Sequence, residues 1–380
     1  MKVALVHEWL TNLAGSERVV EAFGVLFPDA PVHVAVHRNG LGERLGLSEV
    51  RTSFLQRFPL PHQALLPLMP LAFETFDLRA FDLVLTSTHA CAKGVLVRPD
   101  ALHVAYCHTP TRYLWDMAPE YLASVPAMIR PFVALQLHRL RQWDVLAARR
   151  VDHWIANSSE VQARIRRWYG AESNVVPPPV DVGRFRPAPT TEVGNHMLVV
   201  SRLVPYKRID LAIQACGRLG LPLRIIGDGP ERRRLERMAG PGTTFLGALP
   251  DAQVAHELAR AKALLFPGLE DFGIVPVEAM ASGRPVVALG KGGALDSVVP
   301  RKTGLFFAEP DADHLCLALK EVASLPWAAE DLVSHAAGFA PDRFRARIAN
   351  ELDSLRDRRR RMVAGALETI IPTGSPAGVP

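Results

Sequence analysis

Cysteine is scarce in this sequence, and its placement excludes two classes of protein. The chain has four cysteines, which lie far apart at Cys91, Cys107, Cys216 and Cys316. None belongs to a Cys-x-x-Cys pair, the usual signature of a structural zinc site or a redox pair. Small secreted domains held together by disulfides contain many more cysteines for their length. We therefore expect no disulfide framework and a reducing compartment such as the cytosol.

Long apolar runs are also missing. No stretch approaches the roughly 18–20 apolar residues that a membrane-spanning helix requires. The opening MKVALVHEWL has only a short apolar run, which ends at His7 and Glu8, so it predicts a first β-strand and not a signal peptide. We expect a soluble, cytoplasmic protein.

A strong charge of one sign is absent as well. The formal net charge is +5, from 44 basic and 39 acidic residues. This modest excess favours anionic lipid or phosphate-bearing substrates. The interleaving of aromatic and basic residues that is typical of nucleic-acid binding is lacking, and no aspartate-rich metal motif is present. We therefore expect no nucleic-acid partner and no metal.

What the sequence does contain is a regular alternation of short apolar runs and segments of helical period. The runs have the pattern of strands buried on both faces of a parallel sheet. A first series comprises residues 3–7, 32–37, 83–87, 102–107 and 153–157, and a second comprises 197–201, 223–226, 244–246, 263–266 and 285–289. Strand–helix alternation of this kind predicts the α/β class, with two Rossmann-like domains that face a central cleft.

Prolines mark the division between the two series. The segment Val-Pro-Pro-Pro-Val-Asp at 176–181 cannot continue a helix or a central strand. The sequence therefore predicts an N-terminal domain over 1–176, a linker over 177–193 and a C-terminal domain over 194–340. A basic helix is expected over 341–366, and the Pro/Gly-rich end predicts a flexible tail over 367–380.

The segment from Glu270 to Glu278 carries the strongest functional signal. It follows the run 263–266, and a helix is expected over about 275–282. Free backbone N–H groups before that helix suit sugar hydroxyls or a phosphate; they belong to Phe272, Gly273 and Ile274. The two carboxylates offer separate acceptors for hydroxyl groups. A surface loop with a solvated glutamate is the competing interpretation.

Two cations follow the run 197–201. Arg202 lies at the end of this strand and Lys207 lies where the next helix begins, so the pair suits a clamp on a diphosphate. Fixed cations stabilise a leaving diphosphate more strongly as its negative charge develops. Two solvated surface cations are the competing interpretation of this segment alone.

Weaker signals lie at other strand ends. Gly15 lets the backbone approach a ligand, although an ordinary strand–helix turn explains it equally well. The Gly-Asp-Gly-Pro turn at 227–230 lacks the full dinucleotide fingerprint. His108 follows the run 102–107, where open α/β sheets place ligands, and its polar–aromatic loop suits carbohydrate. A structural histidine is the alternative.

Together these motifs resemble the retaining GT-B glycosyltransferases of family 4 over nearly the whole chain. The segment from Glu270 to Glu278, followed by Ala-Met-Ala-Ser-Gly-Arg-Pro-Val, matches in order and spacing with the Arg202 and Lys207 pair and the segment 176–181. Two narrower stretches resemble bacterial mannosyltransferases of surface-polysaccharide assembly: Cys-His-Thr-Pro-Thr-Arg-Tyr-Leu-Trp-Asp at 107–116 and Ser-Arg-Leu-Val-Pro-Tyr-Lys-Arg-Ile-Asp at 201–210.

The resemblance implies a nucleotide-diphosphate sugar as donor substrate and no cofactor. It assigns the acceptor, a glycan or a polyprenyl-linked sugar, to the N-terminal domain and the donor to the C-terminal domain, and it packs the final helix back on the N-terminal domain. Glu278 would bind the ribose hydroxyls and Glu270 the donor sugar. The implied donor-binding residues are Gly15, Arg202, Lys207, Glu270, Phe272, Gly273, Ile274 and Glu278; the implied catalytic residues are Glu270, His108, Arg202 and Lys207.

The resemblance also implies a retaining, front-side substitution, in which the departing phosphate takes the proton from the acceptor hydroxyl. GDP-mannose is the donor expected from the narrower resemblance. Two positions depart from the family pattern. Ala14 precedes Gly15 where many relatives have two glycines, and Asp296 stands where relatives often have glutamate. Both departures concern details of donor contact.

Other functions fit the same fold. A nucleotide-sugar epimerase would eliminate the nucleotide and add water, so a product assay with water as sole acceptor separates it from a transferase. A non-catalytic nucleotide-sugar-binding protein would be expected to lose the basic clamp or the paired glutamates, and the sequence keeps both. A membrane-scaffold role would depend only on basic patches.

Two segments of mixed apolar and basic character predict a peripheral contact with an anionic membrane. Residues 54–71 and 128–150 combine large apolar side chains with arginines and histidines, which suits the headgroup boundary. The contact would place the N-terminal domain on the inner face of the cytoplasmic membrane. Core helices with solvated basic edges are the competing interpretation.

Overall fold

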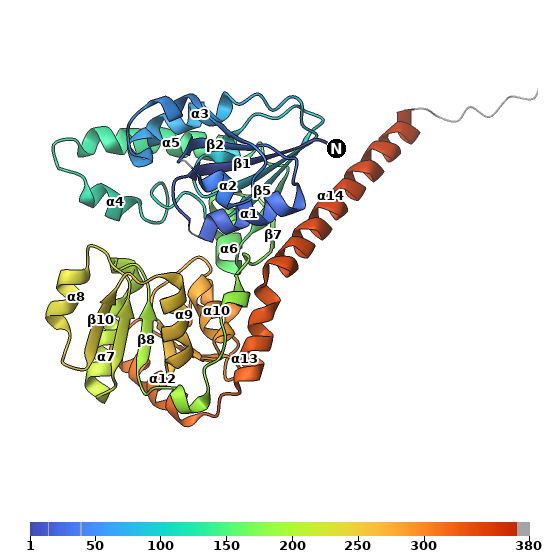
Figure 1. The fold of residues 1–380 in the computed structure, drawn as a ribbon. Helices are drawn as coiled ribbons and strands as arrows, with labels where there is room; N and C mark the ends of the chain where they lie inside the picture. The colour runs from blue at the N-terminus through green and yellow to red at the C-terminus, as the bar shows by residue number, and fades with distance from the viewer. Residues whose placement is uncertain (14, 39, 371–380) are drawn as a thin grey trace, which may run out of the picture.

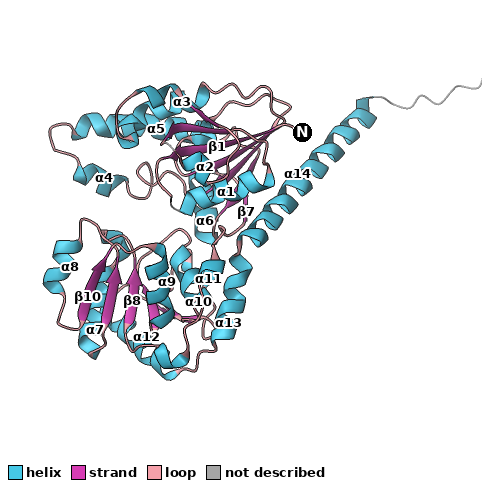
Figure 2. Ribbon diagram, in the orientation of Figure 1, coloured by secondary structure: helices cyan, strands magenta, loops and turns pink. Residues whose placement is uncertain are grey.

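A computed structural model describes residues 1–13, 15–38 and 40–370 of the chain. It contains two β-sheets, each covered by helices, in two domains that lie one above the other in Figure 1. Figure 2 shows the strands at the centre of each domain. Neighbouring strands pair in parallel throughout both sheets of the described chain. The expected α/β class with two Rossmann-like domains is confirmed.

The N-terminal sheet has seven strands in the order β3-β2-β1-β4-β5-β6-β7. They are β1 (Val3–Leu10), β2 (Val32–His37), β3 (Val50–Thr52), β4 (Leu83–Thr88), β5 (Leu102–Cys107), β6 (His153–Ala156) and β7 (Ser173–Val175). The strand order reverses between β1 and β4. The connections after these two strands therefore diverge, and a crevice forms at their carboxyl ends.

The C-terminal sheet has six strands in the order β10-β9-β8-β11-β12-β13. They are β8 (Met197–Val200), β9 (Leu223–Ile226), β10 (Thr243–Gly247), β11 (Ala263–Phe266), β12 (Val286–Leu289) and β13 (Gly304–Phe307). Here the order reverses between β8 and β11, which again opens a crevice at the carboxyl ends.

Three strands were not predicted from the sequence: β3, β7 and β13. All three lie at sheet edges, and β3 and β7 have only three residues each. An edge strand of this length needs few apolar residues, so it leaves no periodic pattern to detect.

The helices of the N-terminal domain are α1 (Gly15–Leu26), α2 (Leu41–Arg44), α3 (Met69–Glu74), α4 (Ala118–Ser124), α5 (Arg130–Ala148) and α6 (Ser159–Tyr169), with 3-10 turns η1 (Phe54–Arg57), η2 (His62–Leu68) and η3 (Ala92–Gly94). Local sequence fixes α6 at both ends. The Ser158 hydroxyl accepts a bond from the Val161 N–H at 3.1 Å, and Gly170 ends the helix with a φ of 63°.

The linker and the C-terminal domain contain η4 (Val182–Arg184), η5 (Thr190–Glu192), η6 (Pro205–Lys207), α7 (Ile209–Leu219), α8 (Arg232–Met238), α9 (Asp251–Arg260), α10 (Ile274–Ala281), α11 (Ala294–Ser297), α12 (Ala312–Ser324), α13 (Ala329–Ala336), η7 (Ala337–Phe339) and α14 (Pro341–Ile370). Among the helices in the described ranges, none is both long enough and apolar enough to span a bilayer.

The last helix, α14, starts beside the C-terminal domain and continues past the N-terminal domain (Figure 1). Phe344, Ile348 and Leu352 lie on one face of it and join the core of the N-terminal domain. The ring of Phe344 stacks on that of Phe23 with centres 5.9 Å apart. The helix runs to Ile370, which corrects the predicted end at 366 and the predicted start of a tail at 367.

The reason for this longer helix lies in its sequence. Residues 362–370 read Met-Val-Ala-Gly-Ala-Leu-Glu-Thr-Ile, a stretch without proline in which good helix formers predominate. The first proline comes at Pro372, and residues 371–380 of the predicted tail lie outside the described residues.

Candidate functional site

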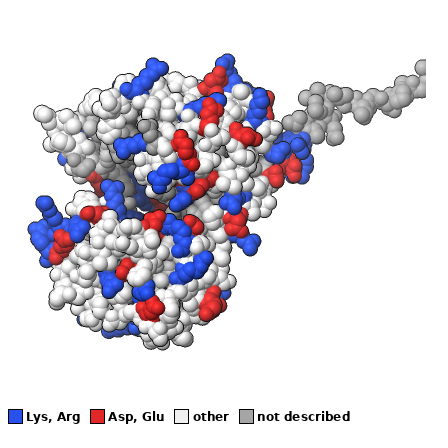
Figure 3. Space-filling model, viewed as in Figure 1, with Lys and Arg blue, Asp and Glu red and all other residues white. Residues whose placement is uncertain are grey.

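A cavity of about 440 Å³ lies between the domains, where Figure 3 shows the surface hollowed. Its N-terminal wall consists of residues that follow β1, β4, β5 and β6, together with one linker residue: Gly15, Ser16, His89, His108, Thr109, Arg112, Asn157 and Pro178. The facing wall follows β8 and β11 and consists of Tyr206, Glu270, Asp271, Phe272, Gly273, Ile274 and Val275. Both walls belong to carboxyl ends of strands, the edge at which open α/β sheets bind ligands.

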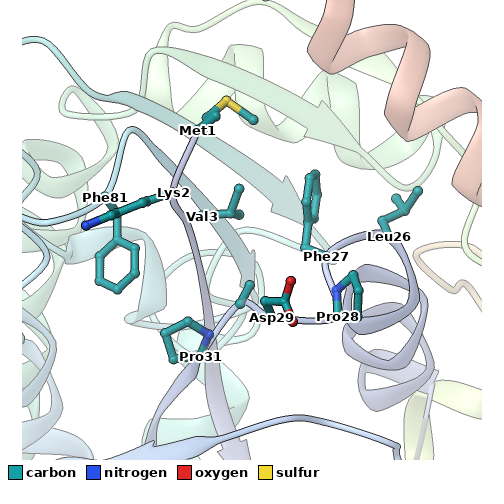
Figure 4. A pocket seen from close by; sticks show the side chains of 10 residues that line it. Met1, Lys2, Val3, Leu26, Phe27, Pro28, Asp29, Pro31 and Phe81 are labelled. Carbon is teal, nitrogen blue, oxygen red and sulfur yellow. The ribbon is translucent and has the colours of Figure 1, made fainter.

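A second hollow, of about 420 Å³, lies at the opposite edge of the N-terminal sheet (Figure 4). Its lining includes Lys2 at the start of β1, Pro31 before β2 and Phe81 before β4. These positions are amino ends of strands. The cavity between the domains is therefore the candidate site.

The structure brings most of the predicted site residues together. Six of them line the cavity: Gly15, His108, Glu270, Phe272, Gly273 and Ile274. Lys207 reaches the same group through an ion pair between its Nζ and a carboxylate oxygen of Glu270. Arg202 is exposed, and in the described chain its side chain forms no ion pair or hydrogen bond. Donor binding by these residues remains a prediction.

Two glycines let helix starts from opposite domains meet at the cavity. Gly273 precedes α10 with a φ of 86°, and a Cβ there would lie 2.6 Å from the Phe266 ring. A Cβ on Gly15, the first residue of α1, would lie 2.7 Å from Cδ1 of Ile274. The free N–H groups and positive dipole ends of α1 and α10 therefore converge on one space, which suits an anionic ligand.

Small corrections apply to the predicted loop and helix. The helix α10 begins at Ile274 and ends at Ala281, one residue earlier at each end than predicted. The side chain of Phe272 is only 3% exposed, and its ring centre lies 5.8 Å from that of Phe339. Phe272 thus anchors the loop in the core, and only its backbone faces the cavity. The predicted departure at Ala14 lies outside the described residues.

Lys207 and Glu270 neutralise each other across the C-terminal wall. Both side chains are more than four-fifths buried, and the Lys207 ammonium also lies 5.2 Å from the centre of the Tyr206 ring. Because the ammonium is already paired, a phosphate that enters the cavity must compete with Glu270 for it. A bound anion would then release the Glu270 carboxylate to accept hydroxyl hydrogens.

Glu278 lies one turn beyond the cavity, in α10. Its carboxylate is 17% exposed and lies 3.9 Å from Nη2 of Arg184. Burial raises the pKa of Glu278 to about 7; Arg184 opposes this rise, while Asp251 and Asp181 add to it. The rise per residue of a helix puts Glu278 about 6 Å along the axis from Ile274. A ligand in the cavity must therefore extend along α10 to reach Glu278.

His108 is held from behind by the neighbouring strand. Its Nε2 lies 2.8 Å from the hydroxyl of Ser87 in β4, and its ring centre lies 6.0 Å from that of His89. Burial, with smaller contributions from His89 and His7, holds the pKa of His108 well below its usual range. His108 is therefore a neutral hydrogen-bonding group near pH 7.

Two buried charges that were not predicted fix the loops around His108. The Glu8 carboxylate accepts bonds from the Thr88 hydroxyl and from four successive backbone N–H groups at residues 89–92. Asp144 on α5 forms an ion pair with Lys93 at 2.6 Å. It also accepts from the Thr111 hydroxyl at 3.1 Å and the Trp115 indole at 2.8 Å. The loop 108–116 is thereby tied to α5.

Two acidic residues of the C-terminal domain tie it to the N-terminal domain. Oδ1 of Asp271 accepts from Arg112 at 3.1 Å and from Arg164 at 2.5 Å. The Asp296 carboxylate accepts from the backbone N–H of Ser159 at 3.1 Å and from its hydroxyl at 2.9 Å, at the start of α6. Asp296, noted above as a departure from the family pattern, thus joins the domains.

A larger cavity of about 740 Å³ adjoins the first, and the two share Arg112 and Tyr206. Its other lining residues are Tyr113, Asp116, Met117, Glu120, Tyr121, Arg164, Pro205 and Leu269. Aromatic and aliphatic groups dominate this list. Charged groups stand among them, and Arg164 bonds Asp116 at 3.1 Å. The cleft therefore contains a polar cavity and a more apolar one side by side.

No group of three or more His, Cys, Asp or Glu side chains in the described chain has a metal-binding arrangement. Independence of metal ions remains a prediction.

Profiles of known protein families match both halves of the chain. The profile described as Glycosyltransferase Family 4 matches residues 13–184, and the profile described as Glycosyl transferases group 1 matches residues 185–338. Both profiles describe glycosyltransferases, and together they span residues 13–338. The two matches meet within the predicted linker, so each of the two sheets carries one profile.

Relatives of this chain differ in the reactions that their names describe. The chain is 32% identical over 179 residues to a GDP-mannose-dependent alpha-(1-6)-phosphatidylinositol monomannoside mannosyltransferase of Mycolicibacterium smegmatis. This alignment covers 40% of this chain and 47% of the relative. The chain is also 32% identical over 212 residues to a glycogen synthase of Mycobacterium tuberculosis, in an alignment that covers 51% of this chain and 50% of the relative. The chain thus spans about half the length of the curated relatives it matches.

Solved structures confirm the GT-B fold. The crystal structure of Anabaena HepE in complex with UDP superposes with a TM-score of 0.70 at 20% sequence identity, covering 93% of this chain and 100% of that chain. At this identity the likeness establishes the arrangement of the two domains. The ligand belongs to that protein.

Proposed function

We propose that this chain is a retaining, metal-independent hexosyltransferase that takes mannose from GDP-mannose and delivers it to a hydroxyl of a glycan or polyprenyl-linked acceptor. The main observation is the cavity in which the starts of α1 and α10 converge beside the Lys207–Glu270 pair and His108. Two helix N-termini and a cation suit a diphosphate, and carboxylate and imidazole groups suit sugar hydroxyls. The GDP-mannose donor is inferred from the mannosyltransferase relatives.

Each residue has a role in this proposal. The starts of α1 and α10 hold the diphosphate, and Lys207 transfers its interaction from Glu270 to the leaving phosphate. Arg202 adds a second cation, and Glu278 accepts from the ribose hydroxyls farther along α10. Glu270, once released, accepts from hydroxyls of the donor sugar, and His108 donates to that sugar from the opposite wall.

The bond changes balance without an enzymic nucleophile. The bond between the anomeric carbon and the phosphate oxygen breaks, and the electron pair stays on the phosphate. The acceptor oxygen then bonds to the anomeric carbon from the same face, and its proton moves to the departing phosphate oxygen. Fixed positive groups beside the phosphate stabilise the developing charge, which is where they lower the barrier most.

A nucleotide panel tests the donor. GDP is expected to raise the thermal midpoint of the protein more than UDP or ADP at equal concentration, because selective binding to the folded state stabilises it by mass action. At 100 times its dissociation constant a ligand contributes about 2.7 kcal/mol. Equal shifts with all three nucleotides would leave the base unassigned, and no shift with any of them would contradict donor binding.

The larger cavity supports transfer to an acceptor. It opens beside the donor cavity and shares Arg112 and Tyr206 with it, so an acceptor there would present its hydroxyl to the donor sugar. An epimerase that adds water needs no such space. Aromatic side chains such as Tyr113 and Tyr121 suit the apolar faces of sugar rings or a lipid segment.

We further propose that the N-terminal domain docks on an anionic membrane through the turn between α4 and α5. Met128 is 91% exposed and Phe132 65%, and Ile129 and Leu135 are also exposed. Arg139 is an exposed cation on the same helix. An apolar face beside cations suits the headgroup boundary. In Figure 1 this turn lies on the same side of the molecule as α8.

Liposome sedimentation tests this docking. The protein is expected to pellet with anionic vesicles at low salt, to remain in the supernatant with neutral vesicles, and to be released by salt. Phe132→Asp should abolish pelleting and Arg139→Glu should weaken it. Leu317→Asp is the matched control, because Leu317 is also 65% exposed but lies on α12 of the other domain. If wild type and Phe132→Asp pellet equally, this face is not the docking surface.

A further inference from the structure

A line of four buried or half-buried polar side chains runs behind the cavity. Glu17 in α1 lies 3.7 Å from Nε2 of His7 in β1. Nδ1 of His7 lies 3.2 Å from the backbone carbonyl of Ser87 and 3.1 Å from its hydroxyl. That hydroxyl lies 2.8 Å from Nε2 of His108. Glu17, His7 and Ser87 are almost fully buried, so this line is closed to solvent except at His108.

One end of the line meets the cavity, and the other end lies directly behind the cavity wall. His108 lines it directly, and Glu17 follows Gly15 and Ser16, which line it at the start of α1. The arrangement depends on the pairing of β1 with β4, which sets His7 opposite Ser87. His108 directly follows β5, which pairs with the other edge of β4, so its ring lies on the other side of the Ser87 hydroxyl.

The bonding pattern assigns the protons. A backbone carbonyl only accepts, so Nδ1 of His7 must carry a hydrogen and donate to Ser87. The Ser87 hydroxyl then accepts from His7 and has its own hydrogen free to donate to Nε2 of His108. Nε2 of His108 is therefore bare, and the neutral ring carries its hydrogen on Nδ1. The Glu17 carboxylate lies 3.7 Å from the other nitrogen of His7.

We propose that Glu17, His7 and Ser87 are positioning residues that hold His108 in the tautomer with its hydrogen on Nδ1. Nε2 is occupied by Ser87, so Nδ1 is the nitrogen left for a ligand. His108 would then meet the donor sugar as a hydrogen-bond donor at every pH at which the fold is intact. This role depends on the proposed sugar transfer for its purpose, although the tautomer itself does not.

Several titratable or charged groups surround His108. They are His7 and Glu8 on β1, Glu17 on α1, His89 after β4, Tyr106 on β5, Arg112 on the same wall and, across the cavity, Glu270 and Asp271. Burial and the two histidines hold the pKa of His108 well below its usual range. The hydrogen on Nδ1 of His108 therefore does not come from protonation of the ring. The hydrogen bond from Ser87 to Nε2 must set the tautomer instead.

Nitrogen NMR of the full chain, labelled with ¹⁵N in its 13 histidines, tests the tautomer without donor or acceptor. A protonated and a bare ring nitrogen resonate far apart, and a His108→Asn variant identifies the signals of His108. We expect a protonated Nδ1 and a bare Nε2 in the wild type and a mixture in Ser87→Ala. The reverse tautomer in the wild type overturns the proposal, even if GDP binds and transfer occurs.

Kinetics then separate positioning from a merely structural role. At pH 8 and saturating donor, Ser87→Ala is expected to lower kcat about 5- to 10-fold, the loss of roughly one neutral hydrogen bond. Ser87→Thr, which keeps the hydroxyl, should retain most of the activity.

Thr86→Val is the matched control. Thr86 is the preceding residue of β4 and faces the other side of the sheet, where its hydroxyl lies 3.4 Å from Nε2 of the buried His103. It should keep the wild-type kcat. No loss in Ser87→Ala, or an equal loss in Ser87→Thr, overturns the positioning role. Should Ser87→Ala fail to fold, the wild-type NMR measurement still decides.

Discussion

Lys207→Ala is expected to lower the single-turnover rate of sugar transfer by about 10²- to 10³-fold at saturating donor. Lys207 is a cation beside the cavity, and its pairing with Glu270, which lines the cavity, shows that it reaches the ligand space. As the sugar–phosphate bond breaks, charge builds on the phosphate, and a fixed ammonium stabilises that state more than the bound donor. Rapid quench with radiolabelled donor measures the rate.

The control for Lys207→Ala is Lys291→Ala, which breaks a similar but exposed pair with Glu309 at 3.1 Å. It should leave the rate within about twofold, since exposed pairs contribute little. If Lys207→Ala keeps its turnover and only raises the Michaelis constant, Lys207 binds donor and transition state equally, and the clamp on the leaving group is excluded.

Glu278→Gln is expected to move stability and donor affinity in opposite directions. An amide accepts more weakly from two ribose hydroxyls, so the dissociation constant of the nucleotide diphosphate should rise about 10- to 100-fold at pH 8. The free protein should become more stable at the same pH, because the variant no longer buries a carboxylate charge whose desolvation is unfavourable. Calorimetric titration measures the first effect and urea unfolding the second.

The pH dependence gives the sign of the stability change. Burial raises the pKa of Glu278 to about 7 in the fold, from an ordinary value of 4.5. A group with a raised pKa favours the fold below pH 4.5, and this contribution is lost as pH rises through 7. A shift of this size corresponds to about 3 kcal/mol. Glu278→Gln should thus gain most over wild type above pH 7 and little at pH 4.5.

The exposed Glu330 on α13 provides the control for this pair of measurements. Glu330→Gln should change neither donor affinity nor the pH profile of unfolding. If Glu278→Gln binds the nucleotide as tightly as wild type while folding normally, the ribose role of Glu278 is wrong. An unchanged stability above pH 7 would contradict its raised pKa instead.

The sequence predicted the parts of this fold that repeat a local pattern. Central strands such as β2, β5 and β9 were predicted at their observed bounds because burial on both faces leaves a mostly apolar run. The edge strands β3 and β7 have no such run. The rule that ligands bind at carboxyl ends of strands also selected Gly15, His108 and Glu270, each of which follows a strand.

The remaining parts of the site depend on contacts between distant residues. His7 meets Ser87 and Thr88 meets Glu8 across 80 positions of the chain, and only the reversal of strand order between β1 and β4 makes them neighbours. Polar residues inside a buried strand, such as His7, Glu8 and Ser87, were a visible signal that was not used. The pairing of Arg164 with Asp271 depends on how the two domains dock, which no local pattern records.

The path of α14 affects the order in which the protein can be completed during synthesis. Its residues Phe344, Ile348 and Leu352 fill the core of the domain that is translated first. That domain emerges from the ribosome early but cannot close its core until the helix has also emerged, whereas the C-terminal sheet is entirely encoded before α14. The domain made first is therefore finished last, and until then its unfilled core would be exposed to chaperones and proteases.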